Sequence, residues 1–260
     1  MADHPEHDQL VRLDVTAGVA TITLDSPHNR NALSAQLRRE LGEHLDAALA
    51  ADAVRVIVLS HTGSVFCSGM DLKEASSGAV AGQEFPRILE SIWTSAKPVV
   101  ARLAGPARAG GLGLVAACDL AVAADTVTFA LTEVRIGVVP AVISVTVLPR
   151  MLPRAANELF LTGETFDANR AVAIGLINSA VPADQLDGEV RRYTGMLALG
   201  APGALAATKA MLRASRPAAM AEDLAEMLEL SARHFGSDEG REGMAAFFEK
   251  RPPRWVPSAD

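Results

Sequence analysis

Apolar residues recur along the chain at two spacings, which separate the predicted strands from the predicted helices. Residues 11–15 and 20–24 alternate between apolar and polar on either side of Ala17-Gly18, which predicts a β-hairpin. Leucines then repeat every four residues from 37 to 49, so they form one stripe on a helix that Ser34 is placed to cap. The chain is therefore predicted to begin as strand, strand, helix.

Two segments further along combine a strand pattern with a glycine loop. Residues 54–60 (VRVIVLS) predict a strand, and residues 66–71 (FCSGMD) form a glycine loop that leads into polar, helix-like sequence. After a helix predicted at 85–96, the stretch 98–119 predicts a buried strand, a tight loop with two adjacent glycines, and a buried Ala-rich helix. Glycine loops at helix N-termini leave N–H groups free to receive negative charge. Two such loops in one domain can aim two N–H groups at one oxygen.

Beyond residue 120 the pattern turns from strands to helices. Residues 120–124 and 127–131 predict short strands, the proline-interrupted segment 138–152 predicts helix or buried loop, and 167–174 predicts a helix that ends at Gly175.

From about residue 188 the pattern is helical throughout. We therefore predict a core domain at 1–187 and a helical lobe at 188–260. One helical face of the lobe carries an apolar stripe that we expect to pack against another subunit. The stripe consists of Leu224, Met227, Leu228 and Phe235, and Ser231 lies on the same helical face.

Composition narrows the class of protein. At 260 residues, 49% of them hydrophobic, the chain can bury a sizeable core and fits an α/β or α+β enzyme. A net charge of −7 without a basic block argues against nucleic acid as a partner. Cys67 and Cys118 lie next to apolar residues, so a disulfide framework is not expected. Because no signal-like segment and no apolar run of about 20 residues is visible, we expect a cytoplasmic protein with no membrane contact.

The two glycine loops together resemble those of the crotonase (enoyl-CoA hydratase/isomerase) superfamily. The resemblance rests on FCSGMDLKEA followed by AGPARAGGLGLVAACD, and it extends from SPHNRNALS to the tail EGMAAFFEKR. It implies the α/β class, with a ββα spiral core and an α-helical C-terminal lobe that assembles homotrimers or hexamers. It also implies that the N–H groups of Met70 and Gly110 form an oxyanion hole for the thioester oxygen of an acyl-CoA.

A competing motif overlaps the second loop. Residues 111–116 (GLGLVA) fit the dinucleotide fingerprint G-x-G-x-x-A after a strand. That fingerprint normally opens its domain, whereas here it begins at residue 111, and Asp119 and Asp125 come too early to bind a ribose. Dinucleotide binding is therefore the weaker interpretation.

Glu133, within FALTEVRIGVVP, is the candidate acid–base residue. A carboxyl group among so many apolar residues is expected to have a raised pKa, which suits proton transfer near neutral pH. A solvated Glu at a strand end is the alternative, but the resemblance places a catalytic Glu at this position.

The chain departs from the superfamily at Gly113. Standard hydratases carry a second Glu three residues after the glycine of the oxyanion hole, where this chain has Gly113. A single carboxylate suits double-bond isomerisation, in which a proton moves from one carbon to another. Yet GLGLVAACDLAVAAD and TEVRIGVVPAVIS also resemble bacterial hydratases of branched enoyl-CoA, such as methylglutaconyl-CoA hydratases.

The resemblance also implies contacts with the substrate and its coenzyme A. Phe247 and Lys250, in FFEKR, resemble a tail that meets CoA across a subunit boundary. Arg108, two residues before Gly110, is able to pair with a second carboxylate on the substrate, although a lone charge there is expected to face solvent. The other predicted contacts are Arg30, Ser68, Asp71, Lys73, Gly113 and Pro140.

We therefore expect an enzyme that adds water to a 2-enoyl-CoA, using Glu133 and the Met70/Gly110 hole. The first alternative is an enoyl-CoA double-bond isomerase that uses Glu133 alone, and the second is a CoA-thioester-binding protein with weak or no catalysis. The six histidines lack metal-ligand spacing, so no metal site is expected. Coenzyme A is expected as part of the substrate, with no separate cofactor.

Overall fold

The computed structural model describes residues 9–76, 83–214 and 220–256, and it contains a six-stranded sheet in the order β1-β2-β3-β4-β6-β9. The predicted hairpin is confirmed: β1 (Val11–Thr16) and β2 (Val19–Leu24) are antiparallel. The other neighbours in the sheet are parallel. They are β3 (Val56–His61), β4 (Val99–Leu103), β6 (Leu120–Ala124) and β9 (Ser179–Val181).

A second, three-stranded sheet has the order β5-β7-β8. It consists of β5 (Ala107–Arg108), β7 (Thr128–Ala130) and β8 (Phe166–Asp167). The strand β5 falls where the sequence predicted a loop, because two residues after a proline are too few to show a two-residue periodicity. Its pairing with β7 places the second glycine loop next to the segment that leads to Glu133.

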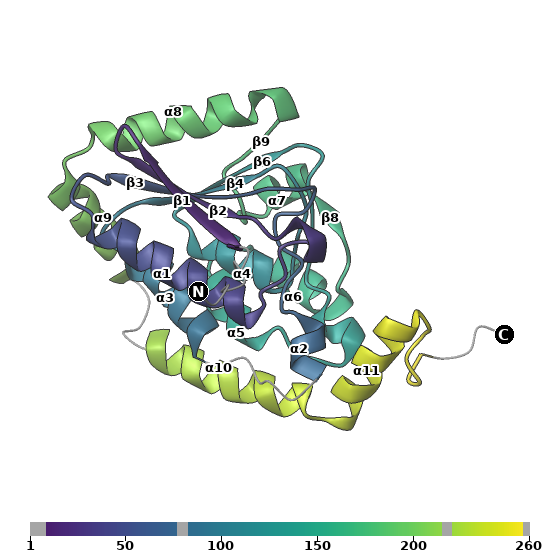
Figure 1. Ribbon diagram of the computed structural model, residues 1–260. Helices are drawn as coiled ribbons and strands as arrows, with labels where there is room; N and C mark the ends of the chain where they lie inside the picture. Colours follow the sequence, from purple (N-terminus) through teal and green to yellow (C-terminus); the bar gives the residue numbers. More distant parts are fainter. Residues whose placement is uncertain (1–8, 77–82, 215–219, 257–260) are drawn as a thin grey trace, which may run out of the picture.

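Helices cover both sides of the main sheet (Figure 1). The helix α1 (Ala35–Ala50) begins as predicted, since the Ser34 hydroxyl accepts a hydrogen bond from the Leu37 N–H at 3.3 Å. It packs against β1, β2 and α3 (Glu84–Thr94). On the opposite side, α8 (Leu186–Leu199) packs against β3, β4 and β6.

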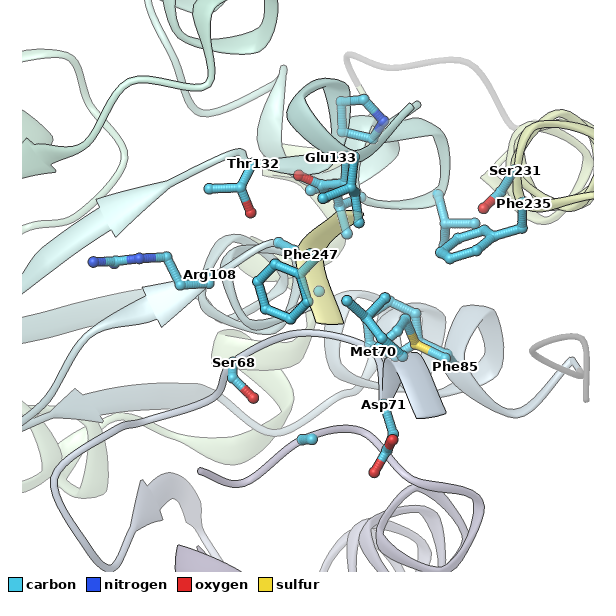
Figure 2. Close-up of a pocket in the computed structure, with 18 of the residues that line it drawn as sticks. Ser68, Met70, Asp71, Phe85, Arg108, Thr132, Glu133, Ser231, Phe235 and Phe247 are labelled. Atoms are coloured by element: carbon cyan, nitrogen blue, oxygen red, sulfur yellow. The ribbon is translucent and has the colours of Figure 1, made fainter. Parts of the chain in front are cut away.

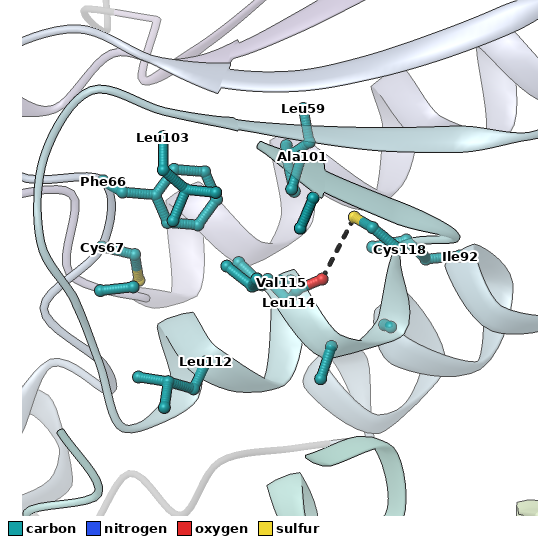
Figure 3. Packing of buried hydrophobic residues seen from close by; sticks show 14 of the residues in the cluster. Leu59, Phe66, Cys67, Ile92, Ala101, Leu103, Leu112, Leu114, Val115 and Cys118 are labelled. Carbon is teal, nitrogen blue, oxygen red and sulfur yellow. Dashed lines mark hydrogen bonds between the residues drawn. The ribbon is translucent and has the colours of Figure 1, made fainter. Parts of the chain in front are cut away.

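The buried helix predicted after the second glycine loop is α4 (Gly110–Ala117), and every one of its residues is buried. A helix that is apolar all round is stable only when packed on all sides, and Figure 3 shows Leu112, Leu114 and Val115 of α4 among core residues of the neighbouring elements. The Cys118 thiol donates to the Leu114 carbonyl at 3.2 Å, and burial raises the pKa of Cys67 and Cys118 to about 12. Both cysteines are therefore inert members of the core.

The remaining helices connect these layers and form the C-terminal part. Of the two outcomes predicted for residues 138–152, helix or buried loop, the structure shows a helix, α5, which begins directly after Pro140. The helix α6 was not predicted from the sequence, because its buried residues are mainly alanines, which give no clear apolar stripe. The further bounds are α2 (Leu72–Ser76), α5 (Ala141–Val147), α6 (Pro153–Thr162), α7 (Ala168–Ala173), α9 (Pro202–Ala214), α10 (Met220–Phe235), α11 (Asp238–Glu249), and the 3₁₀ helices η1 (Pro27–Asn29), η2 (Glu133–Ile136) and η3 (Ala183–Gln185).

Most of the apolar stripe on α10 contacts its own chain, whereas the sequence-based expectation was packing against another subunit. The helix packs against α5 and α3 of its own chain. Leu224 is buried in the core, Leu228 packs against that core, and Ser231 and Phe235 line a cavity. The sequence showed a surplus of apolar surface but not that the chain folds back to cover it.

The hydrophobic core around the main sheet includes residues of the helical C-terminal part. Leu186 and Val190 of α8 belong to the same hydrophobic cluster as the strands, and the boundary proposed at residue 187 lies at the start of that helix. Among the described residues, no single helix is long and apolar enough to cross a membrane. The pair 183–199 and 202–213 reaches that length and composition only together, with a bend of 109° between its parts.

Candidate active site

A cavity of about 700 Å³ lies where the two glycine loops, η2, α5 and the C-terminal helices α10 and α11 meet (Figure 2). Its lining is mostly apolar. The apolar side chains come from elements far apart in the sequence, namely Phe85, Pro86, Ile136, Val139, Val142, Ile143, Leu228, Phe235, Phe247 and Phe248.

The two glycine loops are in direct contact at the cavity wall. Gly69 has a φ of +95°, a conformation that L side chains rarely adopt, and a Cβ atom there would lie 2.8 Å from the Cβ of Ala109 and 3.5 Å from the nitrogen of Gly110. Only glycine therefore allows this approach. The sequence prediction that the loops come together is correct in this respect.

Hydrogen bonds on the outer side of each loop fix the direction of its peptide groups. Leu33 N–H donates to the Gly69 carbonyl at 2.8 Å, and Leu112 N–H donates to the Ala109 carbonyl at 2.8 Å. Because the C=O and N–H of a trans peptide point in opposite directions, the N–H groups of Met70 and Gly110 point away from these donors.

The N–H groups of Met70 and Gly110 donate no hydrogen bond to any described residue, and both residues line the cavity. Gly110 is the first residue of α4, so its N–H has no acceptor within the helix. Two backbone donors without an acceptor among the described residues therefore lie in the wall of one cavity.

Glu133 enters the same cavity from η2. Its Oε2 atom is buried and has no hydrogen-bond partner among the described residues, although other parts of the residue remain accessible. Burial raises the pKa of Glu133 to about 7, and a hydrogen bond from its own backbone N–H only partly opposes this. Figure 2 shows Glu133 above and Met70 below in the cavity. A carboxyl group with this pKa can both take and give a proton near neutral pH.

Gly113 does not line the cavity, which corrects its predicted role as a substrate contact. It lies inside α4, and its carbonyl accepts a hydrogen bond from the Thr146 hydroxyl at 3.1 Å. A Cβ atom at this position would lie 2.6 Å from Cγ2 of Ile143, which itself lines the cavity. An apolar side chain from α5 therefore fills the place beside Gly113.

Arg108 neither faces solvent freely nor presents its guanidinium to the cavity centre. Its Nη1 donates to the carbonyls of Ala107 at 3.0 Å and Thr128 at 2.5 Å, and its Nη2 donates to the Thr128 hydroxyl at 2.7 Å. Figure 2 shows the guanidinium directed away from Glu133 and Met70. The side chain fastens β5 to β7, and its burial lowers the pKa of the guanidinium.

Asp71 also has a local structural contact. Its Oδ1 accepts a hydrogen bond from the Lys73 N–H at 3.0 Å, so it caps the short helix α2. It lines the cavity with the rest of its loop, and Figure 2 shows its carboxylate directed away from Glu133.

The other predicted contacts fall into two groups. Arg30, Ser68, Lys73, Pro140 and Phe247 line the cavity, and the two cations among them, Arg30 and Lys73, are exposed. Lys250 does not line it; this residue caps the C-terminus of α11 in a left-handed conformation (φ +54°) and is exposed. Phe247 reaches the cavity from this chain's own α11, so its contact requires no second subunit.

Sequence reasoning missed most of the apolar wall. Phe85, Ile143 and Phe235 stand on three different helices and carry no motif, so only the fold brings them together. The amphipathic stripe of α10 was the available signal, but it was interpreted as a subunit contact. Within residues 9–76, 83–214 and 220–256, no group of three His, Cys, Asp or Glu residues is arranged to hold a metal ion.

The decisive comparison is with protein families: the model for enoyl-CoA hydratase/isomerase matches residues 14–257. The chain belongs to this family. It is 46% identical to an enoyl-CoA hydratase from Mycobacterium avium, whose crystal structure superposes with a TM-score of 0.85 over 96% of this chain and 100% of that one. Carnitinyl-CoA dehydratase of Proteus mirabilis is 34% identical over 95% of this chain and 98% of its own length.

A third relative performs different chemistry on the same fold. A methylmalonyl-CoA decarboxylase, solved in complex with 2-nitronate-propionyl-CoA, is 26% identical with a TM-score of 0.84, covering 96% of this chain and 99% of that one. The enoyl-CoA hydratase/isomerase fold and its α/β class are thus shown for this chain. Family membership leaves the reaction to be argued from the site.

Proposed function

We propose that the protein is an enoyl-CoA hydratase that adds water reversibly to a 2-enoyl-CoA, with Glu133 as its single acid–base group. One observation carries the proposal. The Glu133 carboxyl group, which has a pKa of about 7 and a buried oxygen without a hydrogen-bond partner among the described residues, shares a cavity with the backbone N–H groups of Met70 and Gly110, which donate no hydrogen bond to a described residue. These are the parts needed to move a proton at the carbon next to a thioester carbonyl.

The proposed reaction begins with Glu133 ionised. The carboxylate takes a proton from water while the water oxygen bonds to the β-carbon of the substrate. The electrons of the carbon–carbon double bond move toward the thioester oxygen, which accepts hydrogen bonds from the N–H groups of Met70 and Gly110. Glu133 then gives the proton to the α-carbon, which restores the ionised carboxylate and completes the addition of one water. Each N–H donor is expected to contribute about 10²–10³ in rate.

The names of the relatives support hydration or its reverse. The 46%-identical structure is an enoyl-CoA hydratase, and the 34%-identical relative is a dehydratase of a CoA thioester. A single carboxylate is sufficient for the proposed steps because the same group removes and returns the proton on one face of the double bond.

The alternative of double-bond isomerisation has a specific observation in its favour. Ile143 occupies the place beside Gly113 where a second carboxylate would be needed to hold a water, so the cavity near Glu133 is apolar. An isomerase needs only Glu133 to move a proton from one carbon to another, and it needs no water.

The cavity also suits the coenzyme A part of the substrate at its exposed side. The cations Arg30 and Lys73 line it there and can attract the phosphates of CoA, while the apolar side chains of α3, α5 and α10 suit the acyl group. We propose that CoA enters with the substrate and that no separate cofactor takes part.

Mass spectrometry of products from a panel of 2-enoyl-CoA and 3-enoyl-CoA thioesters tests the proposal. A hydratase increases the mass of a 2-enoyl substrate by one water. A product of unchanged mass with a shifted double bond supports the isomerase. Calorimetry that shows CoA-thioester binding with no turnover on the whole panel supports a binding protein instead and contradicts the hydratase.

We also propose that the chain assembles into homotrimers or hexamers, as the family resemblance implies. Large apolar side chains remain exposed on the isolated subunit, among them Leu148, Leu152, Leu161 and Leu199. Light scattering at micromolar concentration should give the mass of three or six chains. A monomer would contradict this proposal without affecting the chemistry at Glu133.

A further inference from the structure

We infer that Leu33, held in place by Arg38, is a positioning residue that fixes the N–H groups of Met70 and Gly110 relative to each other. The inference rests on the proposed function, because these two donors have a shared role only if they bind one thioester oxygen.

Leu33 contacts both glycine loops at once. Its backbone N–H donates to the Gly69 carbonyl at 2.8 Å, which orients the Gly69–Met70 peptide. Its side chain reaches the other loop: a Cβ atom on Gly110 would lie 2.7 Å from Cδ1 of Leu33. Leu33 is 0% exposed, so its side chain has little freedom to move away. One residue therefore links the backbone of the first loop to the surface of the second.

Arg38 holds Leu33 from helix α1. The Arg38 side chain is only 6% exposed, and its Nη1 donates to the Leu33 carbonyl at 2.6 Å. Its carboxylate partners are more distant, with Nε at 3.4 Å from Glu84 and Nη1 at 4.0 Å from Glu74. Burying a guanidinium is costly unless its donors are satisfied. The shortest bond of this buried charge goes to the Leu33 carbonyl.

These contacts form a continuous path from α1 to the proposed oxyanion hole. The Ser34 cap begins α1 directly after Leu33, so Leu33 is fixed at a rigid helix end. From there the path runs through the Leu33 N–H to Gly69 and through the Leu33 side chain to Gly110. A displacement of about 1 Å in such groups can cost about 10²-fold in rate. Leu33 and Arg38 thus affect the reaction without touching the substrate.

The test compares matched variants that differ in contact with the loops. Leu33→Ala is compared with Leu41→Ala, because Leu41 has the same 0% exposure but lies two turns into α1. Arg38→Met and Arg38→Lys are compared with Arg39→Met, because Arg39 is exposed on the same helix. Lysine can still donate one hydrogen bond to the Leu33 carbonyl, so Arg38→Lys should partly restore what Arg38→Met loses.

The decisive readout is the infrared stretch of the thioester carbonyl in bound butyryl-CoA labelled with carbon-13 at that carbon. Butyryl-CoA is saturated and does not react, so the measurement reports hydrogen bonding to the oxygen alone. We expect binding to wild type to lower the carbonyl frequency, and the Leu33→Ala and Arg38→Met variants to show less than about half of that shift. The kcat of both variants should fall by about tenfold or more with KM within about threefold, while Leu41→Ala and Arg39→Met retain the full shift.

Two results overturn the inference in distinguishable ways. If wild type shifts the frequency and Arg38→Met and Leu33→Ala shift it equally, the positioning role is wrong while the proposed function stands. If wild type binds butyryl-CoA with no shift, the oxyanion hole itself is wrong, and the proposed function fails with it. Should Leu33→Ala not fold, the Arg38 pair decides, because an equal shift and an equal kcat in Arg38→Met would overturn the inference.

Discussion

Ile143 and Gly113 are packed against each other so closely that a Cβ atom on Gly113 would lie 2.6 Å from Cγ2 and 3.2 Å from Cβ of Ile143. Real Cβ atoms essentially never approach another heavy atom at 2.6 Å, and Ile143 is buried with a stiff, branched side chain. The absence of a side chain at 113 and the presence of Ile143 are therefore two parts of one arrangement. Restoring a second carboxylate requires a change on both helices.

This relationship predicts the cost of adding a single carbon. Gly113→Ala should lower the melting temperature because overpacking a well-filled core costs about 1–3 kcal/mol. The matched control is Gly195→Ala in α8, where a new Cβ atom would meet no heavy atom within 4 Å. That change should be stabilising by about 0.5–1 kcal/mol, since alanine favours helix over glycine. Equal melting temperatures for the two variants would refute the packing argument.

The same relationship predicts the behaviour of a restored carboxylate. Gly113→Glu alone should lower both stability and activity, whereas combining it with Ile143→Ala should recover part of the stability. Differential scanning calorimetry and the hydration assay on simple 2-enoyl thioesters measure the two effects. Increased hydration by Gly113→Glu alone would mean that Ile143 moves aside at little cost.

Glu133→Gln should remove nearly all turnover while leaving affinity for the CoA thioester almost unchanged. Glutamine keeps the volume and can accept the same backbone hydrogen bond, but it cannot carry the proton, and this loss typically costs about 10²–10⁴-fold. Steady-state kinetics and calorimetry measure the two quantities. Glu164→Gln, at an exposed position, is the control and should retain full activity. If Glu133→Gln keeps activity within about threefold of wild type, a group other than Glu133 must transfer the proton.

The raised pKa of Glu133 predicts the pH dependence of the rate. The proposed reaction begins with the ionised carboxylate, and burial raises its pKa to about 7. We therefore expect kcat/KM to be constant above about pH 7 and to fall about tenfold for each pH unit below it. A profile that is flat down to pH 5 would contradict either the pKa or the role of this residue.

The same pKa predicts an effect on stability with a defined sign. A carboxyl group whose pKa rises from 4.5 to about 7 on folding favours the folded state fully below about pH 4.5, and this contribution is lost as the pH rises to about 7. Glu133→Gln lacks this titration. The free energy of unfolding of Glu133→Gln should therefore rise relative to wild type between about pH 4.5 and 7, by up to about 3 kcal/mol, and then remain higher. Its melting temperature relative to wild type should rise over the same pH range. A difference between the two proteins that does not vary with pH would argue against the shift.

Arg108 should matter for stability and not for substrate choice. Its guanidinium donates to Ala107 and Thr128, so Arg108→Met should leave partly buried carbonyl and hydroxyl groups unpaired. We expect this loss to lower the free energy of unfolding by about 1–3 kcal/mol, and with it the melting temperature. The ratio of kcat/KM between enoyl-CoA substrates with and without a distal carboxylate should stay within about threefold of wild type. A selective loss for the carboxylate-bearing substrate would show that Arg108 turns toward the ligand.

The sequence by itself determined the elements whose signals are local. The alternation in residues 11–24 specified the first hairpin, the leucine stripe after Ser34 specified α1, and the glycine spacing at 69 and 110 specified two loops that approach closely. Each depends on side-chain periodicity or on backbone conformations that few residues adopt. The apolar surroundings of Glu133 were likewise visible in its neighbours, and burial does raise its pKa.

Only the tertiary structure decided which distant surfaces meet. Packing between segments far apart in the sequence decided four features of this protein. These are the direction of the apolar stripe on α10, the contact of Ile143 with Gly113, the path of the Arg108 guanidinium and the position of Lys250 outside the cavity. Periodicity shows that a helix has an apolar face but not which partner covers it, because burial against any complementary surface satisfies the same hydrophobic pattern.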